Sequence, residues 1–192
     1  MRKEIRMTCQ GMFKAAAIAL LLLTTAMPAA RADDANSSPA IRLAQTGNKA
    51  PEFTGLSNWF NSEPLTISAL RGKVVLVDFW TYGCSNCVNT LPHVTQLYAK
   101  YKDRGLVVVG IHTPEFPFER SAGNVQTALK RHGITYPVAQ DNDSKTWDAY
   151  RNKYWPAQYI IDQTGNVVYT HAGEGAYDEM DRIVGKLLNA SS

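Results

Sequence analysis

Two cysteines form the group in this chain whose spacing is most suited to chemistry, in the segment Cys84-Ser85-Asn86-Cys87. They lie where an apolar run ends and a helical pattern begins, so Cys84 is expected at a helix N-terminus. The free amide donors and the positive end of the macrodipole at that position favour a thiolate over a thiol. Cys87 is then about one turn further on, near enough to attack a mixed disulfide on Cys84. The spacing predicts a redox pair, with Cys84 as nucleophile and Cys87 as resolving thiol.

Three other interpretations of the pair are weaker. A structural zinc site needs two more ligands, and the chain has no second C-x-x-C or H-x₃₋₅-H, while isolated histidines such as His93 and His112 are more often structural. Covalent haem attachment requires C-x-x-C-H, and Val88 occupies the histidine position. A purely structural disulfide closing so short a loop adds little stability. The residues therefore predict no metal site and no cofactor.

The N-terminus has the features of a secretory signal peptide. A basic start, MRKEIR with Lys14, precedes the apolar run at 15–26, and Ala30-Arg31-Ala32 fits the A-x-A cleavage pattern. The run is shorter than the ~20 residues that a spanning helix needs. We expect cleavage after Ala32 and a periplasmic or otherwise exported protein. The alternative is that the leader is retained as a membrane anchor.

Removal of residues 1–32 changes what the composition means. The whole chain has 192 residues, a net charge of +3 and three cysteines. The leader takes Cys9 with it and leaves 15 basic and 16 acidic residues. The positive charge is therefore no indication of nucleic-acid binding. Polar residues 33–49 predict a flexible linker, and residues 50–192 predict one domain.

Hydrophobic periodicity predicts an α/β domain, because strand-like and helical segments alternate. The expected strands are 50–53, 65–67, 73–80, 106–112, 136–139, 158–162 and 167–170. The expected helices are 85–104, 121–132, 143–150 and 177–189. The first two strands frame the loop at 58–64. The remainder predicts a central mixed sheet with helices on both faces.

Several motifs carry a family resemblance. The segment Val74–Cys87 (VVLVDFWTYGCSNC) resembles the active-site segment of the thioredoxin superfamily. Two motifs resemble the exported TlpA-like branch: APEF at 50–53 and LRGKVVLV at 70–77. Others are similar, more narrowly, to the thioredoxin-like domain of DipZ-type proteins: WTYxC and NC within 80–87, HTPEF at 112–116 and YWPA at 154–157. The resemblance covers about residues 50–189. It implies a thioredoxin fold with an N-terminal β-hairpin extension, and thiol–disulfide exchange in the cell envelope.

The resemblance also implies roles for particular residues. Pro156 occupies the position of the family's cis-proline beside the dithiol, although trans is the commoner state of an X-Pro bond. Asp78 matches the family's buried acid. A desolvated carboxyl there would have a raised pKa and can accept the Cys87 proton, whereas an Asp78 on an edge strand would face solvent.

Aromatic residues near the pair are candidates for substrate binding. Trp80 and Tyr82 can wall the site or simply pack in the core. Trp155 can shape a substrate groove or pack on Trp147. Glu115 is expected to be a solvated loop acid.

The leading hypothesis is an exported thiol:disulfide oxidoreductase that acts on protein dithiol and disulfide clients. TlpA-like proteins mostly act as reductants fed by a membrane electron carrier, so the resemblance favours a reductase with such a donor as partner. A thiol peroxidase is an alternative, since Thr81-x-x-Cys84 matches half of the peroxiredoxin pattern, but Val77 stands where that pattern has proline. A non-enzymatic metal or haem-maturation chaperone is the other alternative, and the lack of a Met/His cluster counts against it.

Overall fold

The computed structural model describes residues 48–190 as a six-stranded mixed sheet with helices on both faces. The strands are β1 (Ser57–Phe60), β2 (Val74–Trp80), β3 (Leu106–His112), β4 (Val138–Gln140), β5 (Ala157–Ile161) and β6 (Val167–Ala172). The α-helices are α1 (Ser85–Tyr101), α2 (Ala122–Arg131), α3 (Lys145–Ala149) and α4 (Tyr177–Asn189), joined by 3₁₀ turns at Ser68–Leu70, Lys102–Arg104 and Pro117–Arg120. The strand order is β1-β4-β3-β2-β5-β6.

Strand β2 lies inside the sheet because its sequence can be buried on both faces. All seven residues of VVLVDFW are buried, and the run is rich in β-branched and aromatic side chains. It pairs in parallel with β3 and antiparallel with β5. The carboxyl end of β2 leads directly into α1, which fixes where the cysteine segment stands.

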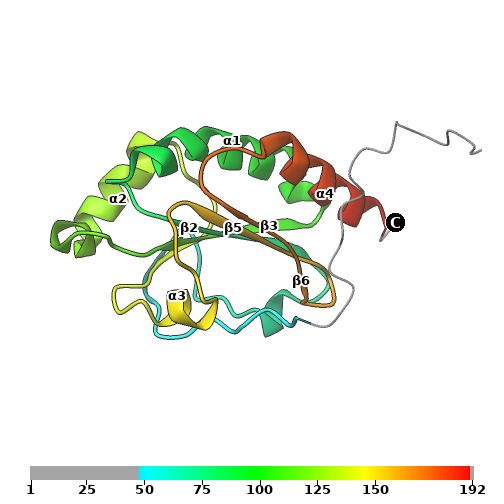
Figure 1. Cartoon of the computed structure of the whole chain (residues 1–192), viewed down its shortest axis with the longest axis horizontal. Helices are drawn as coiled ribbons and strands as arrows, with labels where there is room; N and C mark the ends of the chain where they lie inside the picture. The colour runs from blue at the N-terminus through cyan, green and yellow to red at the C-terminus, as the bar shows by residue number, and fades with distance from the viewer. Residues whose placement is uncertain (1–47, 191–192) are drawn as a thin grey trace, which may run out of the picture. The chain divides into compact units, whose positions relative to one another are not determined.

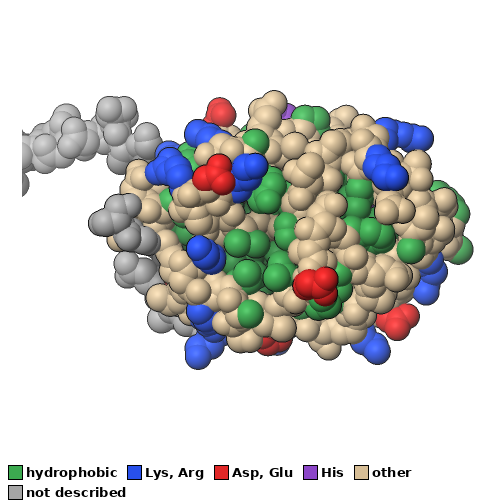
Figure 2. All heavy atoms as spheres, turned by 180° about the vertical axis from the view of Figure 1, so that it is seen from behind, with side chains coloured by type: hydrophobic (Ala, Val, Ile, Leu, Met, Phe, Trp, Pro, Cys, Tyr) green, Lys and Arg blue, Asp and Glu red, His purple; other side chains and the backbone are tan. Residues whose placement is uncertain are grey.

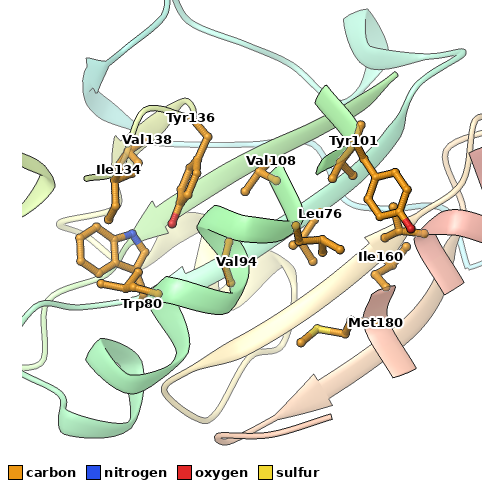
Figure 3. Close-up of a cluster of buried hydrophobic side chains, with 14 of the residues drawn as sticks. Leu76, Trp80, Val94, Tyr101, Val108, Ile134, Tyr136, Val138, Ile160 and Met180 are labelled. Atoms are coloured by element: carbon orange, nitrogen blue, oxygen red, sulfur yellow. The ribbon is translucent and has the colours of Figure 1, made fainter. Parts of the chain in front are cut away.

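Two apolar cores cover the faces of the sheet. Figure 1 shows α1 and α4 together on one face, with α3 on the other. The larger core lies between β2, β3 and the helices α1, α2 and α4. Figure 3 shows part of it, from Trp80 and Tyr136 at one end to Tyr101 and Met180 at the other. The second core includes Phe79 and Tyr150 and packs the N-terminal segment and α3 against the sheet.

Most of the elements expected from the sequence are present. The N-terminus of α2 is capped by Ser121, whose hydroxyl accepts from the Asn124 amide at 3.4 Å. Strands β5 and β6 form the expected antiparallel hairpin. Its turn requires Gly165, which has a φ of +80°.

The expected N-terminal β-hairpin is wrong. Residues 50–53 and 65–67 are not strands, and the strand of this region is β1, which lies in the segment expected to be a loop. It pairs antiparallel with β4 rather than with a neighbour in sequence. The 50–53 segment is held instead by Glu52, whose carboxylate accepts from the Ile67 and Ser68 amides, both at 2.8 Å. Side chain-to-backbone bonds take the place of a strand ladder there.

The predicted signal peptide and most of the predicted linker lie outside the described residues. The last two linker residues are already part of the fold, since the Asn48 carbonyl accepts from Val167 at 2.9 Å and Lys49 bridges to Asn166. Within residues 48–190, no helix is both long and apolar enough to cross a membrane. On the face shown in Figure 2, hydrophobic side chains gather near the centre, and Lys and Arg side chains are scattered towards the rim.

Candidate active site

The two cysteines lie at the junction between β2 and α1. Cys84 is the N-cap residue of α1, and its Sγ accepts a hydrogen bond from the backbone N–H of Cys87 at 3.4 Å. The Cys84 side chain is half-buried, whereas Cys87 is only 1% exposed. Both thiols are free. Cys84 is therefore accessible to a partner molecule, whereas Cys87 is shielded from solvent and lies in contact with Cys84.

Burial controls the protonation of the inner cysteine. The pKa of the Cys87 thiol is raised far above its ordinary value, first by burial and then by its hydrogen bond with Cys84. A backbone hydrogen bond from Thr81 opposes the shift. Cys87 is therefore a neutral thiol at pH 7 and must lose its proton to a neighbouring group before it can attack.

Asp78 is placed to be that group. It lies on β2 opposite Gln158 of β5 and is 1% exposed. Desolvation raises its pKa from 3.8 to about 6, and the hydrogen bond from Gln158 Nε2 to Asp78 Oδ1 (2.9 Å) opposes that shift. The charge on Asp78 is also one of the causes of the raised pKa of Cys87. Asp78 is buried in the interior of the sheet, as the resemblance implied, and its role as a base stays a prediction.

The Trp155–Pro156 peptide bond is cis, as the resemblance implied. Trp155 faces the outer cysteine, because its carbonyl oxygen accepts from the Cys84 thiol at 3.9 Å. The indole Nε1 of Trp155 donates to the Thr113 carbonyl at 3.0 Å, and the ring packs on Trp147 with centroids 4.1 Å apart. The backbone of Trp155 thus borders the site while its ring is anchored beside it.

The other two aromatic candidates, Trp80 and Tyr82, differ in their exposure to solvent. Trp80 is fully buried and packs edge-on against His112. Its indole belongs to the core, so the expectation that it contacts substrate is corrected: an interior strand residue cannot reach a client. Tyr82 is half-buried, and its hydroxyl donates to the Phe118 carbonyl at 2.9 Å. It remains a candidate for substrate binding.

Sequence reasoning missed a second buried acid beside the site. Glu119 is fully buried, and its Oε1 accepts from the backbone N–H of Gly83 at 2.9 Å. Its Oε2 accepts from the Glu115 and Phe116 amides at 2.6 and 2.9 Å. Three backbone donors thus compensate for the burial of the carboxylate. The available signal was a Glu three residues after Phe116 with proline between them, the spacing of a local cap.

The environment of Glu119 includes a neutral histidine. Burial lowers the pKa of His112 to about 4, and the charge of Glu119 opposes that shift. Tyr82 stacks on the His112 ring with centroids 5.4 Å apart, and the Thr81 hydroxyl lies 3.3 Å from His112 Nε2.

Within the described residues, no three His, Cys, Asp or Glu side chains cluster in a way that could hold a metal ion.

Replacement of Glu119 by glutamine is expected to lower the free energy of unfolding by about 2 kcal/mol. An amide has one oxygen, so at least one of the three backbone donors would face an NH₂ group instead of an acceptor. Urea denaturation at pH 7 measures this effect. Glu115→Gln is the matched control, because Glu115 is exposed four residues away. Equal stability of the two variants would contradict the role assigned to the Glu119 carboxylate.

Known proteins share this sequence pattern and fold. The AhpC/TSA family model matches residues 46–170. The DipZ protein of Mycobacterium bovis is 47% identical over 156 residues, which cover 80% of this chain but only 22% of DipZ. The thiol-disulfide oxidoreductase YkuV of Bacillus subtilis is 32% identical over 72% of this chain and 93% of YkuV. A thioredoxin-like protein solved in its oxidised form superposes with a TM-score of 0.68 and 32% identity, over 76% of this chain and 97% of that one.

The matched region contains both cysteines, the buried Asp78 and the cis-proline, and the architecture around them is that of the similar solved structure. The chain therefore belongs to the AhpC/TSA family and is a TlpA-like member of the thioredoxin superfamily.

Proposed function

We propose that the protein is an exported thiol:disulfide oxidoreductase that reduces disulfides of protein clients through Cys84 and Cys87. One observation carries the proposal: a half-exposed thiol at a helix N-terminus is in hydrogen-bond contact with the backbone of a buried second cysteine. The Cys84 thiolate attacks a client disulfide and forms a mixed disulfide. Cys87 then attacks Cys84, releases the client thiol and leaves the protein oxidised. The relative YkuV is named a thiol-disulfide oxidoreductase, which supports the general class of activity proposed.

The preference for reduction rests on the resemblance to TlpA-like proteins, which mostly act as reductants. Reduction potentials in the superfamily span about 150 mV and depend on how well the reduced thiolate is stabilised. A reductase also needs a source of electrons, and a membrane electron carrier is the partner that fits an exported protein.

We expect the reduced protein to reduce insulin disulfides and the Cys84–Cys87 pair to have a reduction potential below about −200 mV. Equilibration with glutathione or thioredoxin buffers of known potential measures the second quantity. The redox state of the pair in intact cells should be mostly reduced. A potential near −120 mV, or a mostly oxidised pair in cells, would assign the protein as an oxidase instead.

Export is tested separately. Cleavage after Ala32 predicts that N-terminal sequencing of the protein from the cell envelope reads Asp-Asp-Ala-Asn, beginning at Asp33. A sequence that begins at Met1 would indicate a retained leader.

Thiol peroxidase activity is the alternative function to test, because the chain matches the AhpC/TSA family model. A peroxidatic cysteine needs hydroxyl and cationic groups beside the peroxide. The Thr81 hydroxyl that the sequence pattern offers is buried and faces His112, and Val77 is buried within β2. Consumption of hydrogen peroxide by the reduced protein at a rate comparable with insulin reduction would favour the peroxidase.

A further inference from the structure

The large hydrophobic side chains that this domain leaves exposed are not scattered. Within residues 48–190 they are Phe116, Phe118 and Tyr154, with exposed fractions of 46%, 58% and 61%. Phe116 and Phe118 follow β3, and Tyr154 directly precedes Trp155, whose carbonyl contacts Cys84. All three therefore lie in the two loops that flank the outer cysteine. Exposed apolar groups gathered in this way mark interaction sites.

Phe116 and Phe118 act as one surface. Their rings stack with centroids 5.7 Å apart and planes within 5°. We call this pair the aromatic arm. The ring of Phe118 also lies beside the active-site loop, because a Cβ on Gly83 would stand 3.8 Å from its Cζ. Gly83 directly precedes Cys84, so the arm begins one residue from the nucleophile.

The aromatic arm is tied to the active-site loop by hydrogen bonds. Glu119 accepts from Gly83 through one oxygen and from Phe116 through the other. Phe118 is held through its carbonyl, which accepts from the Tyr82 hydroxyl at 2.9 Å and from Asn124 Nδ2 at 3.1 Å. A side chain on Gly83 would collide with the Glu119 carboxylate, which explains the glycine before the cysteine. The arm is therefore preformed in the free protein, which lowers the cost of binding.

We propose that the aromatic arm is a docking surface for the client, and that it selects disulfides whose cysteine is flanked by an apolar residue. This inference rests on the proposed oxidoreductase function and names its substrate class. In the mixed disulfide, the client sulfur is bonded to Cys84 Sγ, and Phe118 borders Gly83, the residue that directly precedes Cys84, so the aromatic arm is within reach of residues beside the client cysteine. An apolar side chain there removes both itself and the exposed rings from water, whereas a polar one loses its hydration.

The test uses two disulfide-linked peptide dimers that differ only in the residues beside cysteine, which are leucine in one dimer and serine in the other. The Cys84 thiolate attacks one sulfur and one peptide thiolate leaves. Cys87 then displaces the second peptide, so that two electrons pass from the cysteine pair to the peptide disulfide. A small-molecule dithiol regenerates the reduced cysteine pair, and its direct reaction with the dimers is subtracted. For the wild-type protein, we expect kcat/KM to be about tenfold higher for the leucine dimer, mainly through KM.

The double variant F116S/F118S should bring the ratio of the two kcat/KM values to about one. F116L/F118L is the matched control, because it keeps an apolar surface and should keep most of the preference. Both sites are exposed, so the variants are expected to fold, and thermal unfolding verifies this. A wild-type ratio near one, or an unchanged ratio in F116S/F118S, would overturn the docking proposal. If the wild-type protein reduces neither dimer nor insulin, the oxidoreductase function itself is wrong.

Discussion

Replacement of Cys84 by serine is expected to lower the rate of insulin-disulfide reduction by on the order of 10³-fold or more, to the level of the uncatalysed reaction. The reason is positional. Cys84 is half-exposed at the N-terminus of α1, whereas Cys87 is 1% exposed and its thiol has a raised pKa. No other cysteine lies within residues 48–190 to replace it. Retention of normal activity by the Cys84→Ser protein would end the proposed function.

Replacement of Cys87 by serine is the companion experiment, because it separates the two steps. Cys84 remains able to attack, so one equivalent of client should become trapped in a mixed disulfide, and multiple turnover should stop. Non-reducing gel electrophoresis and mass spectrometry detect the adduct. A Cys84→Ser protein that forms such an adduct through Cys87 would reverse the roles assigned to the two sulfurs.

The second large effect concerns Asp78, whose replacement by asparagine is expected to stabilise the protein at neutral pH. The carboxyl has a pKa of about 6 in the fold against an ordinary value of 3.8. Between these pH values the folded state binds more protons than the unfolded state, so the free energy of unfolding falls as pH rises from about 4 to about 6. Above pH 6 the free energy of unfolding stays lower by the full amount, about 3 kcal/mol.

Asp78→Asn should therefore be more stable than the wild type by about 3 kcal/mol at pH 7, with the difference vanishing near pH 4. Asparagine keeps an oxygen for the hydrogen bond from Gln158. Urea denaturation across this pH range measures the difference. Asp103→Asn is the matched control, because Asp103 is exposed and its replacement changes the net charge equally. A pH-independent difference would contradict the burial argument.

The same substitution should make the enzyme slower. Asp78→Asn removes the group expected to take the proton from Cys87, so the release of client from the mixed disulfide should be about 10²-fold slower at pH 7. The wild-type rate of this step should rise with pH through the pKa of about 6, and the variant should lose that rise. Single-turnover release of a labelled client reports the step directly. An unchanged rate and pH profile would show that Asp78 is not the base.

The site elements that follow from local sequence were predictable. The β-branched run ending at Trp80 predicts an interior strand, and the helical pattern after Cys84 predicts α1. The position of the cysteine pair between them therefore followed from the hydrophobic periodicity of the two segments. Helix α4 has the expected bounds, Tyr177–Asn189, because its apolar stripe is strong. Such signals depend on residues close together in the chain.

The predictions from sequence were wrong or incomplete where contacts between residues far apart in the chain determine the structure. The N-terminal hairpin that the resemblance implied does not form, because β1 pairs with β4, about eighty residues away in the chain. Glu119 resembles any loop acid until the fold brings Gly83, 36 residues earlier, against its carboxylate. Trp80 could not be assigned to the core or the surface until both neighbours of β2 were known.

The sequence by itself therefore determined the chemistry of this protein: two thiols at a strand–helix junction, in a chain whose first 32 residues, the predicted leader, hold its excess of positive charge and its third cysteine. Only the tertiary structure decided which thiol is accessible to solvent, which acid is buried near the inner thiol, and where apolar groups remain exposed. The physical reason is that sulfur spacing is a local property of the chain. Desolvation, which raises the pKa of Asp78 and Cys87, and the exposure of the aromatic arm depend on elements far apart in sequence.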